Sequence, residues 1–211
     1  MGSAGSVPGV ASPRFFFDYG SPYAYLTAER IEALLGPVQW CPVFLVGVFK
    51  AGGRRSWVYT ERAGEEWAEV ERRLRDRGLP PLVLCDGWAD RLIPSSTPAR
   101  STLMAQQVAR VAIEHGRVAA YSRALYRAEF QRGADLTERA TVLAAAEESG
   151  LPVADAAAAI EDPARKDEVR AATEEAVALG VTGVPTVLVG AERFWGDDRL
   201  EDAAAALAAS A

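Results

Sequence analysis

Ser21, Pro22 and Tyr23 stand where the first helix of the chain is expected to begin. Serine is a favoured N-cap residue, and proline is tolerated at the first helical position because its missing amide hydrogen has no partner there. At such a positive helix end, a hydroxyl group and nearby amides can donate hydrogen bonds to an anion, such as the thiolate of a bound thiol peptide. Taken alone, the Ser21-Pro22 step is only a helix cap.

Val184 and Pro185 form a second candidate segment. The stretch from Val181 to Gly190 consists of a glycine-bearing turn and a run of β-branched and apolar residues, which predicts a buried strand. Proline cannot donate to a central ladder, so Pro185 is expected to open that strand. A cis Val184-Pro185 bond would cost little, and it would turn the backbone amide and carbonyl of Val184 outward.

The remaining pattern places both segments in a mixed α/β core. Residues 14–18 predict a strand, a helix runs from Pro22 to the Gly36-Pro37 stop, and a second strand covers about 38–43, which makes a βαβ unit. Helices are then expected at about 57–77, 98–114, 117–131, 138–149, 152–160 and 164–179. Strands return at 186–189 and 193–195, and a helix at about 197–208 closes the chain.

We therefore predict one α/β domain, built from residues 14–49 and 176–211, that is interrupted by an all-helical insertion of residues 50–175. Residues 1–13, rich in Gly, Ser, Ala and Pro, are expected to be a disordered tail.

Composition argues against several classes of protein. The chain has 211 residues and a net charge of −6, so no basic face for nucleic acid is expected. The arginines at 72, 73, 75 and 77 are balanced by nearby acids, which predicts a solvated helix. No segment is apolar enough to span a membrane, and a cytoplasmic protein is expected. Cys41 and Cys85 are too few and too far apart for a metal site or a redox pair.

Three segments resemble the signature segments of 2-hydroxychromene-2-carboxylate isomerases and kappa-class glutathione transferases. They are Asp18-Tyr19-Gly20-Ser21-Pro22-Tyr23, Val181-Thr182-Gly183-Val184-Pro185-Thr186 and Trp195-Gly196-Asp197-Asp198-Arg199-Leu200, and the resemblance covers about residues 14–209. It implies a DsbA-like fold, in which a thioredoxin-like domain, here residues 14–49 and 176–211, is split by a helical insertion. In related oxidoreductases the first turn carries two cysteines. Here Ser21 and Ala24 stand at those positions, so dithiol redox chemistry is excluded at this turn.

The resemblance implies a site for glutathione or another low-molecular-weight thiol. Ser21 would hold the sulfur, and Val184, before a cis Pro185, would pair with the cysteinyl unit through its backbone. Asp198, and less surely Asp197, would receive the γ-glutamyl end, although carboxylates at a helix start are also ordinary caps. Tyr23 and Lys50 would lie near the second substrate. The sequence departs from the family pattern at Gly52-Gly53 and at residues 94–97, which concerns the second substrate more than the thiol site.

The implied activity is that of a glutathione-dependent cis-trans isomerase. Its substrate would resemble 2-hydroxychromene-2-carboxylate, an aromatic ketoacid, and the thiolate would add to it reversibly. Two alternatives are a glutathione transferase that releases a stable conjugate and a thiol-binding accessory protein without turnover. The expected partner is a small aromatic molecule, and neither nucleic acid nor a membrane is expected as a partner. A homodimer is a possible assembly.

Overall fold

The computed structural model describes residues 12–88 and 102–210. The expected tail therefore lies almost wholly outside the described residues, as do residues 94–97 and the predicted start of the helix at 98. The strands are β1 (Arg14–Phe17), β2 (Gln39–Pro42), β3 (Thr186–Val189) and β4 (Glu192–Trp195). The helices are α1 (Pro22–Ala28), α2 (Ile31–Leu35), α3 (Leu45–Gly52), α4 (Ala63–Asp76), α5 (Leu103–Glu114), α6 (Val118–Arg132), α7 (Arg139–Glu148), α8 (Val153–Glu161), α9 (Pro163–Ala178) and α10 (Leu200–Ala209), with short 3-10 turns η1 (Trp57–Tyr59) and η4 (Asp197–Arg199).

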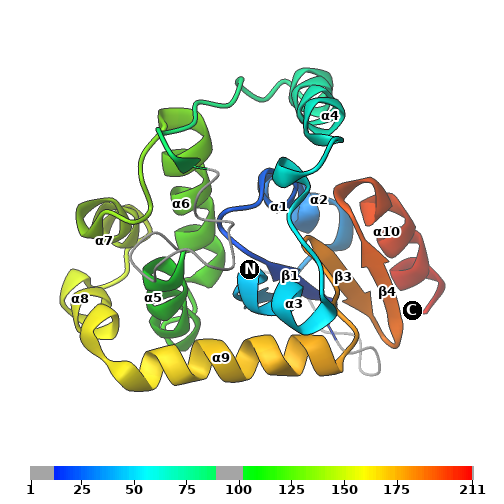
Figure 1. Cartoon of the computed structure of the whole chain (residues 1–211). Coiled ribbons are helices and arrows are strands. Elements are labelled where there is room, and N and C mark those ends of the chain that lie inside the picture. The colour runs from blue at the N-terminus through cyan, green and yellow to red at the C-terminus, as the bar shows by residue number, and fades with distance from the viewer. Residues whose placement is uncertain (1–11, 89–101, 211) are drawn as a thin grey trace, which may run out of the picture.

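The four strands form one mixed sheet in the order β2-β1-β3-β4. β1 pairs parallel to β2, and it pairs antiparallel to β3, which in turn pairs antiparallel to β4 (Figure 1). The first two strands thus come from the start of the chain and the last two from its end. The sheet brings residues 170 or more positions apart in the sequence into neighbouring strands, such as Phe16 and Thr186.

Three consecutive phenylalanines show that both faces of the sheet are covered. Successive side chains of a strand point to opposite faces. Phe15 and Phe17 accordingly join a large core with α1, α2, α5, α6 and α10, whereas Phe16 packs in a smaller core with residues of α3 and α9. A strand buried on both faces is uniformly apolar, which explains the Phe-Phe-Phe run.

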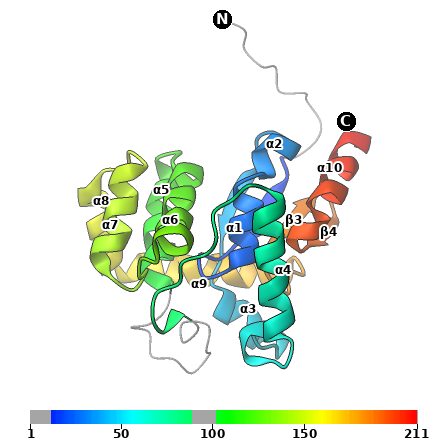
Figure 2. The ribbon, with the colours of Figure 1, turned by 90° about the horizontal axis from the view of Figure 1, so that it is seen from above.

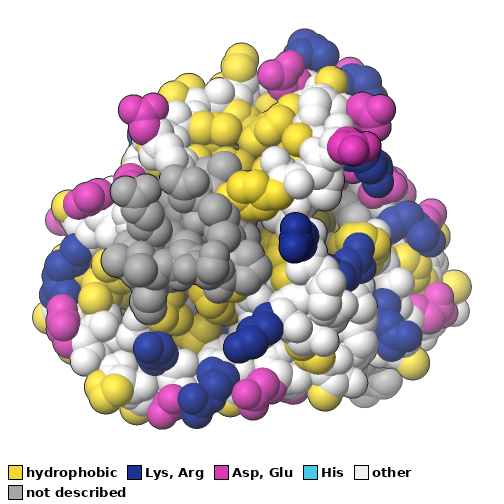
Figure 3. Space-filling view, viewed as in Figure 1, with side chains coloured by type: hydrophobic (Ala, Val, Ile, Leu, Met, Phe, Trp, Pro, Cys, Tyr) yellow, Lys and Arg dark blue, Asp and Glu magenta, His cyan; other side chains and the backbone are white. Residues whose placement is uncertain are grey.

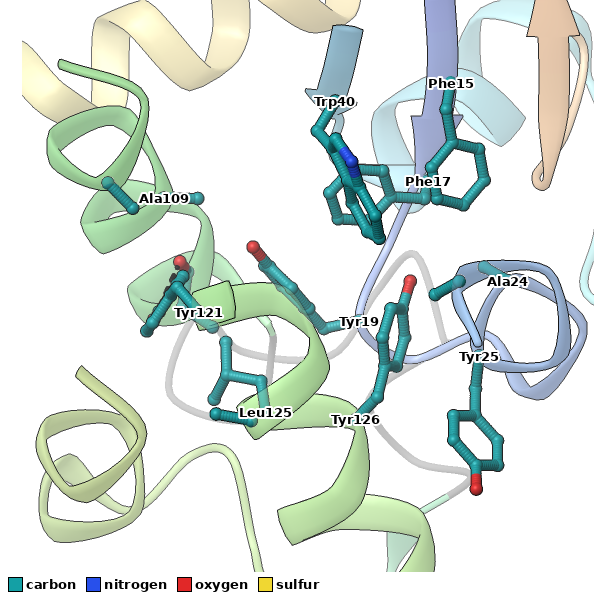
Figure 4. Packing of buried hydrophobic residues seen from close by; sticks show 14 of the residues in the cluster. Phe15, Phe17, Tyr19, Ala24, Tyr25, Trp40, Ala109, Tyr121, Leu125 and Tyr126 are labelled. Atoms are coloured by element: carbon teal, nitrogen blue, oxygen red, sulfur yellow. Dashed lines mark hydrogen bonds between the residues drawn. The ribbon is translucent and has the colours of Figure 1, made fainter. Parts of the chain in front are cut away.

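The large core continues without a break into the helical insertion. Tyr19, Tyr121 and Tyr126 meet between the end of β1 and helices α5 and α6, with ring centroids about 6 Å apart (Figure 4). The Tyr126 hydroxyl donates to the carbonyl of Asp18 at 3.1 Å, and the Tyr19 hydroxyl lies 3.1 Å from Ser122 Oγ. A tyrosine can be buried at low cost when its hydroxyl group has a hydrogen-bond partner. These tyrosines therefore join the helical insertion to the sheet domain.

The helices of the insertion do not all lie together. α5 to α8 stack on one side of the molecule, whereas α4 lies apart from them beside α1, and α9 runs beneath both groups to reach the sheet (Figures 1 and 2). α4 buries Val70 and Leu74 in the large core. The insertion thereby supplies a wall, α4, that stands next to the N-terminal turn of the sheet domain.

Two of the predicted helices have the wrong boundaries. The helix expected from Pro22 to Gly36 is broken between Ala28 and Ile31, where Glu29 pairs with Arg127 and Arg30 pairs with Glu201. Those partners lie on α6 and α10, so the break depends on tertiary contacts that periodicity cannot register. The helix expected at 57–77 is the turn η1 followed by α4.

Helix α3 was not predicted at all. Its sequence, Leu45–Gly52, contains two glycines and no local side chain that caps its start. The cap comes from distant residues instead: the Leu45 amide donates to Asp18 Oδ2 at 2.8 Å, and the Phe44 amide donates to Thr173 Oγ1 at 3.0 Å. These bonds satisfy N–H groups that a helix start leaves without partners.

Acidic and basic side chains are interspersed over the face shown in Figure 3. Among the described residues, no helix is both long and apolar enough to cross a membrane. The same residues contain no group of three or more His, Cys, Asp and Glu side chains that could hold a metal ion.

Candidate functional site

A cavity of about 600 Å³ opens where the α1 turn, the segment between α3 and α4, helix α4 and the two loops flanking β3 and β4 meet. Its lining contains most of the residues that the sequence predicts for the site, namely Ser21, Tyr23, Val184, Pro185, Asp197 and Asp198. These residues come from three distant segments of the chain. Neither Cys41 nor Cys85 lines the cavity.

Ser21 caps the N-terminus of α1. Its Oγ accepts a hydrogen bond from the Ala24 amide at 3.2 Å, and its own amide donates to the Asp18 carbonyl at 3.2 Å. Because Oγ is used here as an acceptor, the hydroxyl hydrogen can be donated to a ligand. His115, the only histidine of the chain, ends α5 and pairs with Asp155, so it cannot act as a base for Ser21. Ser21 is therefore equipped as a hydrogen-bond donor and not as a nucleophile.

Asp18 fixes the turn at the start of α1 through hydrogen bonds. Its buried carboxylate accepts from the amides of Gly20 and Leu45, both at 2.8 Å, and from the hydroxyl of Thr102. Burial raises the pKa of Asp18 above its usual value, although these hydrogen bonds oppose the shift. One side chain thus links the α1 turn, the start of α3 and the segment that leads into α5. The sequence analysis did not identify this role.

Val184 and Pro185 lie directly before β3, and the bond between them is cis. Among the described residues, neither the amide nor the carbonyl of Val184 has a backbone partner. The loop is held from both sides, because Thr186 Oγ1 donates to the Gly183 carbonyl at 2.8 Å and the Gly196 amide donates to the Pro185 carbonyl at 2.9 Å. Val184 consequently offers one unpaired amide and one unpaired carbonyl to the cavity.

Gly183 allows Trp195 to lie against this loop. A Cβ atom at position 183 would stand 2.7 Å from Trp195 Nε1, closer than side-chain carbons approach. Trp195 is nevertheless half exposed, and the guanidinium carbon of Arg54 lies 4.5 Å from the centre of its ring. An aromatic face capped by a cation is therefore part of the cavity wall.

Asp197 and Asp198 differ sharply in their surroundings. Asp197 is completely buried, and its two oxygens accept from Arg77 at 2.6 and 3.0 Å, from Arg73 at 2.9 Å and from Thr27 at 3.2 Å. The Asp198 side chain is 63% exposed, and Oδ1 lies 3.7 Å from Arg73 Nη1. Only Asp198 has oxygens to offer a ligand, whereas Asp197 fastens α4 and η4 to α1.

Tyr23 projects into the cavity beneath α4. Its hydroxyl donates to Glu66 Oε2 at 2.7 Å, and its ring lies edge-on to Trp57 with centroids 6.1 Å apart. Burial, followed by the contact with Glu66, raises the pKa of Tyr23 well above its ordinary value, so the phenol stays protonated at neutral pH. Tyr23 and Trp57 give this side of the cavity an aromatic wall.

Lys50 does not belong to the cavity. It lies exposed on α3 and is absent from the lining, because the unforeseen helix turns it toward solvent. Arg54 and Arg55, just beyond the end of α3, line the cavity in its place. Among the described residues neither arginine has an ion-pair partner, so both can receive an anionic group.

The prediction of a solvated arginine-rich helix is wrong for Arg73 and Arg77, which hold the buried Asp197. The Arg73 side chain is only 14% exposed, lines the cavity, and holds Glu69 and Asp197. Its guanidinium carbon lies 5.4 Å from the centre of the Tyr23 ring. A sequence signal was present, since Arg73 and Arg77 are four residues apart and thus share one face of a helix. Their common partner, Asp197, could not be identified without the fold.

Comparison with known protein sequences adds two findings. A family model described as a DsbA-like thioredoxin domain matches residues 14–208. Human glutathione S-transferase kappa 1 is 26% identical over 198 residues, which cover 88% of this chain and 86% of that protein.

Two solved structures resemble this chain in fold. A 2-hydroxychromene-2-carboxylate isomerase superimposes with a TM-score of 0.75 at 19% identity, covering 93% of this chain and 94% of that one. A probable DsbA oxidoreductase from Streptomyces coelicolor does so with a TM-score of 0.71 at 23% identity, covering 94% and 88%. The predicted fold class, a thioredoxin-like domain interrupted by a helical insertion, is confirmed.

Proposed function

The chain belongs to the DsbA-like thioredoxin domain family, and from that premise we propose that it is a glutathione-dependent cis-trans isomerase. The proposed substrate is an aromatic ketoacid that resembles 2-hydroxychromene-2-carboxylate. Glutathione acts as a catalyst that is released unchanged at the end of each cycle.

The observation that carries the proposal is the convergence of three groups on one cavity of about 600 Å³. They are the Ser21 hydroxyl, the unpaired backbone of Val184 and the exposed carboxylate of Asp198. A thiol tripeptide needs a donor for its sulfur, a strand-like partner for its backbone and an anion for its ammonium group. The relationship to a kappa-class glutathione transferase and the absence of cysteine from the cavity lining support a bound thiol in place of a protein thiol.

The proposed reaction begins with the glutathione thiolate, which accepts a hydrogen bond from the Ser21 hydroxyl. The sulfur adds to the carbon-carbon double bond conjugated with the ketone, and the π electrons move to the ketone oxygen to form an enolate. The former double bond is now single and rotates. Collapse of the enolate restores the double bond in the trans arrangement and expels the thiolate, so no atom is gained or lost.

The second substrate fits the other side of the cavity. Tyr23 and Trp57 offer an aromatic wall, and the guanidinium groups of Arg54 and Arg55, which form no ion pair within the described residues, suit the carboxylate of a ketoacid. In this proposal the arginines take the part that the sequence assigned to Lys50.

A glutathione transferase is the second candidate. The human kappa-class relative favours it, because that protein is a transferase by name. The two activities share the addition step and differ in whether the thioether collapses or leaves the protein. A thiol-binding accessory protein would bind glutathione without either step.

The test follows glutathione and the ketoacid together. Calorimetric titration with glutathione is expected to show one site per chain, and the ultraviolet spectrum of a hydroxychromene carboxylate is expected to change only when both protein and glutathione are present. Chromatography then separates the candidates: an isomerase leaves the glutathione concentration constant, whereas a transferase consumes glutathione and accumulates a conjugate. Binding with neither change would leave the accessory role, and no binding would refute the proposal.

A further inference from the structure

Arg73 of α4 lies beside Asp198 in the cavity wall, and its guanidinium group is only partly used. Nε donates to Glu69 Oε1 at 2.6 Å, and Nη1 donates to Asp197 Oδ2 at 2.9 Å and lies 3.7 Å from Asp198 Oδ1. In the described part of the chain, Nη2 has no hydrogen-bond or ion-pair partner. The group therefore keeps one nitrogen with which to donate to a ligand.

The positive charge of Arg73 is not cancelled by these neighbours. Glu69 is shared with Arg72, which donates to it at 2.8 and 2.9 Å, and Asp197 is shared with Arg77, which grips it through both terminal nitrogens. Tyr23 lies under the guanidinium plane and limits its movement. Arg73 is thus a fixed, partly screened cation immediately next to the exposed carboxylate of Asp198.

We propose that Arg73 is a further specificity-determining residue of this site and completes the recognition of the free α-amino acid head of the thiol ligand, whose ammonium group the proposed function already gives to Asp198. Asp198 accepts hydrogen bonds from the ammonium group, and Arg73 Nη2 donates to the α-carboxylate on the same carbon. This inference rests on the proposed function, since the sulfur must lie at Ser21 for the γ-glutamyl end to reach this pair. It narrows the ligand to γ-glutamyl thiols and disfavours thiols whose far end is a sugar or a nucleotide.

Arg77 provides a matched control for Arg73. Both arginines belong to the same end of α4 and hold the same buried carboxylate, Asp197. Only Arg73 lines the cavity. The variants Arg73→Gln and Arg77→Gln each remove one arginine from Asp197, so a loss of binding that follows from damage to the ion cluster should occur in both.

The experiment measures the affinity for two ligands by calorimetry: glutathione and 4-aminobutanoyl-cysteinylglycine, which is glutathione without its α-carboxylate. We expect the wild type to bind the analogue about tenfold more weakly than glutathione, the loss of one charge-assisted hydrogen bond. Arg73→Gln should bind glutathione about as weakly as the wild type binds the analogue. Its affinity for the analogue should equal that of the wild type. Arg77→Gln should keep the wild-type preference for glutathione.

Equal affinity of the wild type for the two ligands would overturn the inference, and this comparison needs no variant to fold. An equal loss of preference in Arg73→Gln and Arg77→Gln would also overturn it. Neither result touches the proposed function, which is tested separately by glutathione binding and by the fate of the ketoacid and of glutathione.

Discussion

Replacing Asp197 and Asp198 separately by asparagine should have different effects: Asp197→Asn should lower the free energy of unfolding, and Asp198→Asn should weaken glutathione binding. Asparagine keeps the shape of aspartate and removes its charge. At position 198 the side chain is 63% exposed and its nearest cation, Arg73 Nη1, is 3.7 Å away, so little folding free energy depends on it. At position 197 the carboxylate is fully buried and receives four hydrogen bonds, three of them from arginines.

The expected magnitudes follow from these surroundings. Asp197→Asn leaves Arg73 and Arg77 facing each other without their common anion, and removal of one partner from a buried ion pair costs about 3 kcal/mol of unfolding free energy. Asp198→Asn should change the free energy of unfolding by less than about 0.5 kcal/mol. If Asp198 receives the ligand ammonium, the lost charge-assisted bond should weaken glutathione by about 1–2 kcal/mol, roughly 5- to 30-fold in Kd.

The assay pairs urea unfolding with calorimetric titration of glutathione on both variants. Asp198→Asn should show wild-type unfolding and weaker binding, whereas Asp197→Asn should unfold at clearly lower urea. Wild-type affinity in Asp198→Asn would show that the Asp198 carboxylate does not bind the ligand. Wild-type stability in Asp197→Asn would show that the arginine cluster does not fasten α4.

Ser21→Ala should leave the glutathione affinity within a few fold but raise the pKa of the bound thiol toward the free value of about 8.5, which thiolate absorbance measured against pH would report. The control is Ser149→Ala, which removes a buried hydroxyl outside the cavity. Coincident titrations for the wild type and both variants would contradict the role of Ser21. Arg72 and Arg73 lower the pKa of Glu69 to about 2, so its contribution to stability is complete above about pH 4.5 and is lost as the pH falls toward 2. The free energy of unfolding of Glu69→Gln should therefore lie below that of the wild type by less than about 1 kcal/mol at pH 6, and the difference should disappear as the pH falls through about 2. A difference that does not change with pH would refute the assignment. Gly183→Ala should push Trp195 off the loop, raise its quenching by acrylamide and weaken glutathione, and unchanged quenching would show that the close contact is relieved elsewhere.

The sequence was sufficient to predict the class of fold and the segments that line the cavity. Turn chemistry and periodicity are local properties, and they located β1, the start of α1 at Pro22, and the strand that follows Pro185. The three short segments also carried the family resemblance, and with it the pairing of Ser21 with Val184. No property of composition alone indicated that these two residues lie in one cavity.

Tertiary structure decided what local patterns could not encode. Helix α3 is capped by Asp18, which directly follows β1, and by Thr173 of α9, so its own residues gave no start signal. That helix removes Lys50 from the cavity, and Arg54 and Arg55, just beyond its end, line the cavity in its place.

The difference between Asp197 and Asp198 was likewise invisible in the sequence, where two identical residues stand side by side. It arises because α4 places Arg73 and Arg77 against the start of the last helix, more than 100 positions away in the chain. A charged helix surface that looks solvated when taken alone becomes a wall of the site once a buried carboxylate is packed against it. Burial and charge pairing depend on the neighbours that the whole fold supplies, and for that reason the roles of these residues could be assigned only from the structure.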